Sequence, residues 1–265
     1  MILLTTYHLS HGYRRFSLLH RHTYREILKD ITLNLHSGES VALIGQSGSG
    51  KSTFARTLCG LEVPAMGEVV FRGRTTKQMN QRQKHEMHRH IQMVFQDSVS
   101  AVNPRKTIRD IIAEPLRHLA DMDKHHQEQR ITELLLSLDL KPEDMDKRPA
   151  QMSGGQLQRV CIARALALQP ELVILDEALS NLDLVLQIQL IDLLKEIQRK
   201  TGTAWLLVTH DLRIAQRFCD RIMVMDNGQI VEECHTGDTP HFQHPASIRL
   251  KEAILPPLPT MVTQS

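Results

Sequence analysis

No stretch of this sequence is apolar for long enough to cross a membrane as a helix, which takes about 18 consecutive apolar residues. The apolar start of the chain, MILLTTYHLS, is also too short for a secretory signal peptide. We therefore expect any association with a membrane to come through another protein.

Cysteine is scarce, and its placement argues against metal clusters and disulfides. The four cysteines lie far apart and form no CxxC pair. Three of them fall in segments where helix or strand is expected, so neither a disulfide framework nor an iron–sulfur site is indicated. This pattern suits a reducing cytosol.

An excess of charge of one sign is absent as well. The 32 basic and 30 acidic residues give a formal net charge of +2, which provides no bulk attraction to nucleic acid or to an anionic membrane. The chain has 265 residues, 41 % of them hydrophobic, so it can build the core of one large domain or two modest ones. Its ligands and partners have to be inferred from motifs.

The clearest motif is GQSGSGKST at residues 45–53. It follows the apolar run 41–44 and precedes a helix-like segment that ends at Gly60, so a buried strand turns into a helix there. Glycines allow positive φ and let N–H groups point inward, and a helix N-terminus adds partial positive charge. Such a turn binds phosphate, whereas a flexible glycine loop without a ligand would need neither the strand nor the helix.

The residue types in this loop assign roles on a nucleotide. Lys51 would reach the β- and γ-phosphates, and the hydroxyl of Ser52 would take one position on Mg²⁺. We expect the whole loop to contact the nucleotide: Gly45, Gln46, Ser47, Gly48, Ser49, Gly50, Lys51, Ser52 and Thr53.

The first 40 residues are β-rich, with a strand pattern in residues 3–9 and a period-two alternation in residues 31–35. We expect a polar loop between them, containing Tyr13 and Tyr24. A tyrosine upstream of a phosphate loop could stack on an adenine. An exposed loop tyrosine without a ligand is an almost equally simple interpretation.

Two strands and a polar helix are expected after the phosphate loop. Residues 67–71 form the first strand, which ends in the turn Arg72-Gly73, and residues 78–90 form the helix. The second strand, residues 91–95, runs directly into Gln96. A lone amide at a strand end is usually structural.

The block from about residue 105 to 168 shows helical spacing and no strand pattern. One apolar stripe covers residues 107–119, where Pro115 predicts a break or kink, and a second covers residues 131–138 after the charged link 121–130. We interpret the block as a helical insertion.

The motif MSGGQ near the end of that block predicts a second anion-binding helix terminus. Ser153 can cap the helix that follows, and Gly154 and Gly155 leave its first N–H groups open. An ordinary capped helix, without a ligand, would show the same residues.

Residues 171–177, ELVILDE, predict a central parallel strand that ends in two carboxylates. We expect its end to lie beside the phosphate loop. Asp176 would then bind Mg²⁺ through water, and Glu177 would polarise the attacking water as a general base. Two solvated acids at a strand end are the alternative, which the phosphate loop elsewhere in the chain disfavours.

Residues 184–197 show a helical stripe, and the buried strand 204–208 leads to His210. This histidine could donate to a γ-phosphate, although an isolated histidine would be only a surface residue. The chain is then expected to form a hairpin over residues 222–231 that turns at Asn227-Gly228. The Pro-rich tail after residue 235 is expected to be an extended appendage.

The 15 histidines include clusters at residues 20–22, 85–90 and 125–126. Imidazole suits Ni²⁺. Most of these histidines lie in polar segments without fixed geometry, so we do not predict a metal site there.

Taken in order, GQSGSGKST, Gln96, MSGGQ, LVILDE, SNLD and His210 resemble the ATP-binding cassette of ABC transporters over residues 1 to about 235. The resemblance implies an α/β P-loop ATPase with a RecA-like parallel-sheet core, an N-terminal antiparallel β portion and the helical insertion. Residues 236–265 would be a separate C-terminal tail. It also implies that two cassettes close head to tail over two ATP molecules, so a lone copy should hydrolyse ATP poorly.

The resemblance assigns further roles, residue by residue. Tyr13 is similar to the adenine-stacking aromatic, Gln96 to the residue that links Mg²⁺ and the attacking water to the helical insertion, and His210 to the switch histidine. Asp183 is similar to the loop that crosses the interface between cassettes. The signature that holds the γ-phosphate of the opposite subunit corresponds to Ser153, Gly154, Gly155 and Gln156.

The stretch QDSVSAVNPRKTIRDIIAEPLRHL is similar to the peptide and nickel importer group, and NPRKT, RPAQMSGGQLQRVC and DEALSNLDLVLQ resemble the ATP-binding subunits of nickel importers most. This implies a subunit that drives nickel import, as the ion or a chelate, with di- or oligopeptide import as the alternative. The implied partners are two transmembrane permease subunits, a second, sister ATP-binding subunit and a periplasmic solute-binding protein, at the cytoplasmic face of a bacterial inner membrane. Nucleic acid is not among them.

Two residues depart from the family pattern. Met152 replaces leucine at the start of the signature, and Ala178 replaces the proline after the catalytic glutamate, which would loosen the backbone around Glu177. A soluble cassette acting on DNA or ribosomes is a remote alternative. The interval from Lys51 to Ser153 is too short for the long coiled coil of such proteins, and the sequence has no second phosphate loop. A P-loop GTPase or small-molecule kinase is disfavoured as well, because the sequence lacks an NKxD guanine motif and such enzymes have no use for SGGQ.

Overall fold

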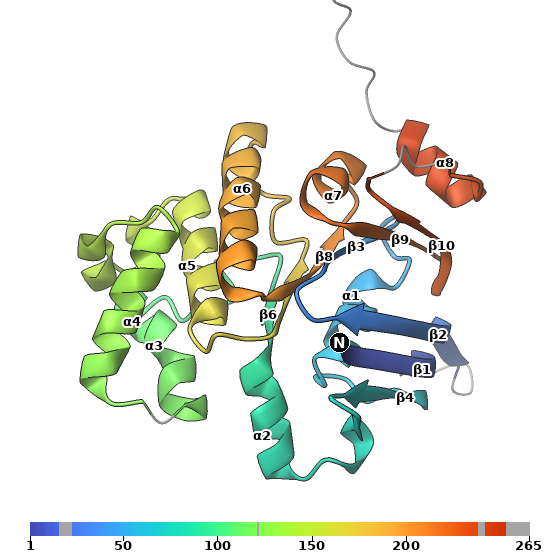
Figure 1. Ribbon diagram of the computed structural model, residues 1–265, viewed down its shortest axis with the longest axis horizontal. Helices are drawn as coiled ribbons and strands as arrows, with labels where there is room; N and C mark the ends of the chain where they lie inside the picture. The colour runs from blue at the N-terminus through green and yellow to red at the C-terminus, as the bar shows by residue number, and fades with distance from the viewer. Residues whose placement is uncertain (16–22, 121, 238–241, 253–265) are drawn as a thin grey trace, which may run out of the picture.

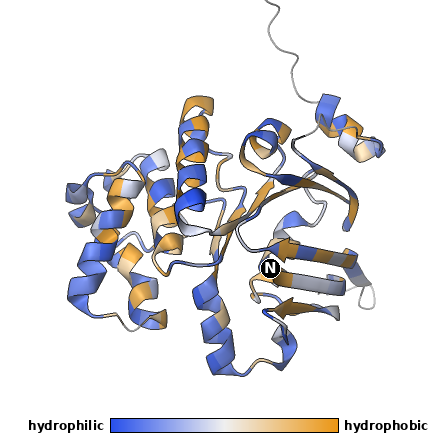
Figure 2. Ribbon diagram, in the orientation of Figure 1, coloured by the Kyte–Doolittle hydropathy of each residue, from blue (hydrophilic) through white to orange (hydrophobic). Residues whose placement is uncertain are grey.

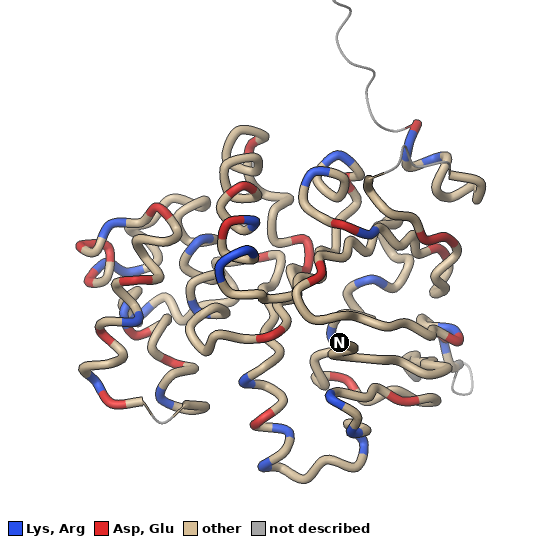
Figure 3. The backbone as a smooth tube through the Cα atoms, viewed as in Figure 1, with Lys and Arg blue, Asp and Glu red and all other residues tan. Residues whose placement is uncertain are grey.

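The described residues form two β-sheets, and Figure 1 shows helices packed around them. The computed structural model describes residues 1–15, 23–120, 122–237 and 242–252. Hydrophobic residues concentrate on the strands and on one side of the helices (Figure 2). Charges of both signs are interspersed along the chain (Figure 3), in keeping with the small net charge.

The antiparallel sheet has the strand order β2-β1-β4-β5 among the described residues. The predicted polar loop around Tyr13 and Tyr24 is wrong, because both residues lie in paired strands and Tyr13 stands opposite Arg25. Both tyrosines are exposed, so this end of the pair needs no apolar alternation and the sequence pattern missed it. The strands are β1 (Ile2–Arg15), β2 (Thr23–His36), β4 (Met66–Phe71) and β5 (Arg74–Thr75).

The second sheet has the order β10-β9-β3-β8-β7-β6 in the part of the chain that the structure describes. Its pairs are parallel except for β9–β10, which form the predicted hairpin. Every residue of β3, β7 and β8 is buried, as expected for central strands covered on both faces. The strands are β3 (Ser40–Ile44), β6 (Ile91–Val94), β7 (Leu172–Asp176), β8 (Ala204–Thr209), β9 (Arg221–Asp226) and β10 (Gln229–His235). The predicted α/β fold class with a parallel core is confirmed.

Alternate residues of this parallel sheet face two separate hydrophobic cores. Ala42 and Ile44 belong to the core that α3–α7 cover, whereas Val41 and Leu43 belong to the core shared with α1, α2 and the antiparallel sheet. Successive side chains of a strand point to opposite faces of its sheet. The antiparallel sheet therefore lies on the face of the parallel sheet that carries α1. The helices are α1 (Lys51–Leu58), α2 (Gln81–His90), α3 (Ile108–Leu119), α4 (Lys124–Ser137), α5 (Gly154–Leu166), α6 (Leu184–Thr201), α7 (Leu212–Phe218) and α8 (Pro245–Glu252).

Helices α3, α4 and α5 form a lobe at one end of the parallel sheet, on the left of Figure 1. Pro115 lies inside α3 without ending it. The charged link predicted before the second stripe is wrong for most of its length, because α4 begins at Lys124, where Asp123 accepts hydrogen bonds from two backbone N–H groups. An N-cap of this kind stabilises a helix start that has no apolar pattern.

The prediction of an extended tail is wrong for residues 245–252, which form α8. The carboxylate of Glu232 in β10 accepts a hydrogen bond from the backbone N–H of Gln243 at 2.7 Å. Ala246 and Leu250 of α8 are buried, and Leu250 belongs to the first core. Two apolar contacts in an eight-residue segment are too few to give a periodic signal in the sequence.

Replacing Phe218→Ala tests the packing around β8. Phe218 and Trp205 are buried with ring centroids 5.9 Å apart, so the change should lower the free energy of unfolding by about 3–5 kcal/mol through lost burial and a residual cavity. Urea unfolding followed by the fluorescence of Trp205, the one tryptophan in the sequence, measures the loss. Phe95→Ala is the control because Phe95 is exposed. Equal losses in the two variants would contradict the packing described here.

Candidate functional site

The carboxyl ends of the central strands meet at one edge of the parallel sheet. The register pairs Ile44 with Thr209, and Asp176 with Val208. Parallel pairing therefore brings the loop after β3 and the two carboxylates at the end of β7 to the same edge. β6 pairs with β7 up to Val94, which places Gln96 at this edge as well.

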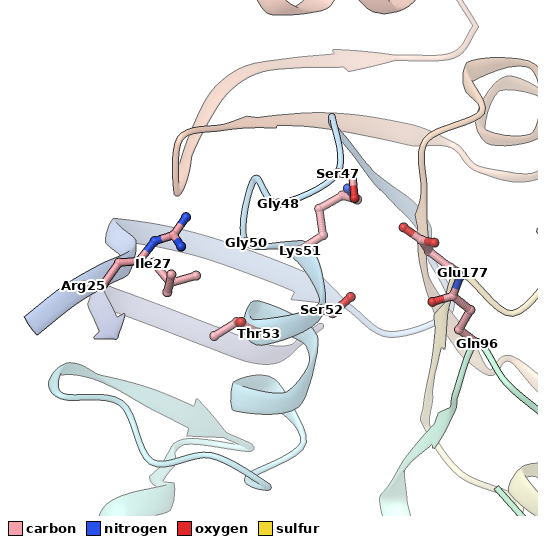
Figure 4. Close-up of a pocket in the computed structure, with 10 residues that line it drawn as sticks. All are labelled: Arg25, Ile27, Ser47, Gly48, Gly50, Lys51, Ser52, Thr53, Gln96 and Glu177. Atoms are coloured by element: carbon pink, nitrogen blue, oxygen red, sulfur yellow. The ribbon is translucent and has the colours of Figure 1, made fainter. Parts of the chain in front are cut away.

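A cavity of about 400 Å³ lies at this edge (Figure 4). Figure 4 shows Glu177 and Gln96 beside each other, facing Ser52 and Lys51. The structure therefore brings the predicted loop, amide and carboxylate together in one chain. The lining residues are Arg25, Ile27, Ser47, Gly48, Gly50, Lys51, Ser52, Thr53, Gln96 and Glu177.

The phosphate loop enters α1 through Gly50, whose φ of 110° only glycine adopts readily. Lys51 is buried, and its Nζ donates to the carbonyl oxygens of Gly45 and Gln46 at 2.8 and 2.9 Å. Burial lowers the pKa of the Lys51 ammonium, against the attraction of Glu177 and Asp176. The side chain is thus folded over its own loop, with its ammonium beside the start of a helix that attracts anions.

Ser52 lines the cavity and contacts Asp176, which is not itself among the described lining residues. The hydroxyl of Ser52 donates to Oδ1 of Asp176 at 2.8 Å. Burial raises the pKa of the Asp176 carboxyl and the charge of Glu177 adds to this effect, while the bond from Ser52 opposes it. Two oxygen donors this close, with an amide nearby at Gln96, fit a hard cation such as Mg²⁺ that keeps most of its ligands as water and phosphate.

Glu177 has a left-handed backbone, with φ of 49°. Its N–H donates to the carbonyl oxygen of Val208 at 3.0 Å, and its own carbonyl oxygen accepts from the hydroxyl of Ser180 at 2.7 Å. Ala178 after it is buried. The expected loosening at Ala178 is therefore opposed by hydrogen bonds on both sides of Glu177, and an unusual φ held in this way is common at functional sites.

Tyr13 and His210 are not among the described residues that line the cavity. The hydroxyl of Tyr13 donates to Glu62 at 2.7 Å, and His210 is exposed one residue beyond β8. Arg25 and Ile27 of β2 line the cavity instead. Sequence reasoning missed both, because only the packing of one sheet on the other brings β2 to the phosphate loop.

The predicted signature also lies outside the cavity. Ser153 caps α5, accepting from the backbone N–H of Gln156 at 3.2 Å. Gly155 faces Leu182 and Leu186, near the start of α6, and Asp183 caps α6 through the N–H of Leu186 at 3.0 Å. These residues form a second region, apart from the phosphate loop of the same chain.

The described residues contain no cluster of three or more His, Cys, Asp and Glu side chains able to hold a metal ion. The cluster at residues 20–22 lies outside the described residues. No helix in the described part combines the length and the hydropathy needed to cross a membrane.

Comparison with known proteins points to one family. A family model described as ABC transporter matches residues 28–180. The nickel import ATP-binding protein NikE of Escherichia coli (strain K12) is 53 % identical over 259 residues, covering 98 % of this chain and 97 % of that protein. NikE of Shigella sonnei (strain Ss046) is 54 % identical with the same coverage.

Solved structures agree with the fold. The ATP-binding cassette MJ0796, a dimer in a post-hydrolysis state bound to ADP and Pi, has a TM-score of 0.79 at 30 % identity, covering 88 % of this chain and 99 % of that one. The structure of cbiO1 from Clostridium perfringens, part of the ABC transporter complex cbiONQ, has a TM-score of 0.76 at 25 % identity, covering 89 % of each chain.

Replacing Asp176→Asn tests the effect of burying this carboxyl group. The pKa of Asp176 in the folded protein is raised above the ordinary 3.8. At pH values between 3.8 and the folded-state pKa, the native state therefore binds more protons than the unfolded state. The free energy of unfolding falls as the pH rises through this range. We expect Asp176→Asn to raise the Tm of the nucleotide-free protein at pH 7, with an advantage that shrinks as pH approaches 3.8. Thermal unfolding with a chelator between pH 4 and 7 measures it. Ser52→Ala is the control, because it removes a hydrogen bond to the carboxylate and should lower the Tm. A lower Tm for Asp176→Asn at pH 7 would contradict the expectation.

Proposed function

This chain belongs to the ABC transporter family, and from that membership we propose that it is the ATP-hydrolysing subunit of a bacterial nickel importer. The observation that supports nickel as the transported solute is the sequence identity of 53 % to NikE over nearly the whole chain. ATP binding belongs to the cassette itself, as the ADP-bound structure of MJ0796 illustrates. The solute is the ion or a small chelate.

We assign a separate role in ATP binding and hydrolysis to each group of residues at the cavity. Lys51 and the loop N–H groups bind the phosphates, and Glu177 accepts the proton of the attacking water as general base. Ser52, Asp176 and Gln96 would hold Mg²⁺, which when bound neutralises charge on the β- and γ-phosphate oxygens. The remaining loop residues from Gly45 to Thr53 orient the nucleotide. Tyr13 and His210 retain the roles predicted from the family, stacking on adenine and contacting the γ-phosphate.

A second ATP-binding subunit completes the site in this proposal. The signature, Ser153 to Gln156, and Asp183 would contact the nucleotide held by the partner's phosphate loop. Their place outside this chain's own cavity supports that arrangement, as does the dimeric structure of MJ0796. We propose a sister ATPase as the partner.

The remaining components are proposed from the family. Two permease subunits would carry the solute across the bacterial inner membrane, with a periplasmic binding protein delivering it, and this chain would sit on the cytoplasmic face. Residues 1–235 would form the ATP-binding domain with its helical insertion at about 105–168, and residues 236–265 a C-terminal tail that includes α8.

Mixing two inactive variants of this chain tests the shared sites, when both are purified without the sister subunit so that any dimer pairs two copies of this chain. Ser153→Arg damages the signature and Lys51→Ala damages the phosphate loop, so a mixed dimer has one composite site with both lesions and one with none. We expect the mixture to show more ATPase activity than either variant alone. Cross-linking must show that mixed dimers form. If they form and activity does not rise, the sites are not shared.

Deleting the gene tests the cargo. We expect lower ⁶³Ni uptake and lower urease or hydrogenase activity in low-nickel medium, with rescue by excess nickel. Wild-type chain should restore uptake, whereas Glu177→Gln should not, because loss of a general base slows turnover by about 10²- to 10⁴-fold. Mg-ATP binding by Glu177→Gln, measured by calorimetry, should be retained. Unchanged nickel uptake with lost growth on a required dipeptide would favour peptide import instead.

A further inference from the structure

The turn between β9 and β10, Asn227–Gly228, touches both sides of the nucleotide cavity. The N–H of Gly228 donates to the carbonyl oxygen of Ser49 in the phosphate loop at 3.0 Å. The carbonyl oxygen of Gly228 accepts from the N–H of Lys29 in β2 at 2.8 Å. One peptide segment therefore joins the phosphate loop to the strand that supplies the opposite wall of the cavity.

The approach on the β2 side leaves no room for a side chain. A Cβ on Gly228 would lie 2.2 Å from the carbonyl oxygen of Ile27, and the side chain of Ile27 lines the cavity. The hairpin touches the phosphate loop at a second point, because a Cβ on Gly45 would lie 2.3 Å from the carbonyl oxygen of Met225. At both glycines the two backbones approach more closely than any residue with a side chain would allow.

We propose that the Asn227–Gly228 turn is a positioning element, which sets the distance between the phosphate loop and the wall formed by Arg25 and Ile27. This inference rests on the proposed function, in which the cavity binds ATP. The phosphates occupy the loop and the start of α1, so Arg25 and Ile27, at the far end from Glu177 in Figure 4, face the nucleoside part. The turn thereby controls affinity for the nucleoside and not for the phosphates.

The topology determines which side yields when the turn is enlarged. Among the described strands, β2 lies at the edge of the antiparallel sheet and pairs with β1. The phosphate loop is anchored between α1 and β3, which lies inside the parallel sheet between β9 and β8. An added methyl group at Gly228 should therefore displace the wall and leave the loop in place.

The chain offers a matched control in the turn between β4 and β5. Arg72 and Gly73 have φ values of 47° and 75°, close to the 48° and 85° of Asn227 and Gly228. A Cβ on Gly73 would meet no described atom within 4 Å. Gly73→Ala thus reports the backbone strain alone, and Gly228→Ala adds the contact with Ile27.

Binding of two ligands to the full-length variants tests the proposal: Mg-ATP, and Mg-tripolyphosphate, which lacks the nucleoside. By calorimetry, Gly228→Ala should weaken ATP binding about tenfold or more and change tripolyphosphate binding less than about threefold, because only the nucleoside wall moves. Gly73→Ala should leave both ligands within about twofold of wild type. Equal loss of both ligands in Gly228→Ala, or the same behaviour in the two variants, would overturn the proposal. A wild-type chain that binds no ATP would refute the proposed function itself.

A measurement on the wild type keeps the test valid if Gly228→Ala fails to fold. In the proposed arrangement Mg-tripolyphosphate contacts the loop and not β2. It should therefore slow hydrogen exchange at the Gly228 amide, which donates to the loop, and also at the Lys29 amide if the turn transmits order to β2. Slower exchange at both amides supports the link. Unchanged exchange at Lys29, with protection of the phosphate loop, would overturn it.

Discussion

The function of this molecule depends on the parallel pairing of β3, β8 and β7. Parallel strands in register end at the same edge, so one set of backbone hydrogen bonds places the phosphate loop and Glu177 around one cavity, with Asp176 hydrogen-bonded to Ser52 of that loop. These strands are buried on both faces, and their apolar residues anchor both cores. The same burial that stabilises the sheet makes the edge rigid enough to hold charged groups at fixed distances.

Two of those charged groups, Lys51 and Asp176, are largely removed from water. Burial lowers the pKa of Lys51 and raises that of Asp176, so each neutral form is favoured relative to water. Their opposite charges and the hydrogen bond from Ser52 only partly offset this. Keeping both groups charged costs free energy in the absence of a ligand. Anionic phosphates beside Lys51 and a cation beside Asp176 would stabilise the charged forms, and pKa values shifted in this way are common at functional sites.

The residues that we predict to contact ATP lie in two regions of the chain. The phosphate loop, Gln96 and Glu177 converge on the cavity, whereas Ser153 and Asp183 cap helices elsewhere. Each cap accepts a hydrogen bond from one of the first N–H groups of its helix, and the helix N-terminus still carries a partial positive charge that attracts anions. The proposal that this second region serves the nucleotide of another subunit rests on that separation.

The sequence by itself determined the motifs and the central strands. Continuous apolar runs such as residues 172–175 leave little alternative to a buried strand, and glycines around Lys51 leave little alternative to a phosphate loop. The sequence pattern did not predict secondary structure where both faces of a strand are solvated, as around Tyr13. It also failed where a single cap or a few contacts determine whether a helix forms, as in α4 and α8. Only the tertiary structure brought Arg25, Ile27 and Gly228 to the phosphate loop, because these contacts join segments far apart in the sequence and leave no local pattern in the chain.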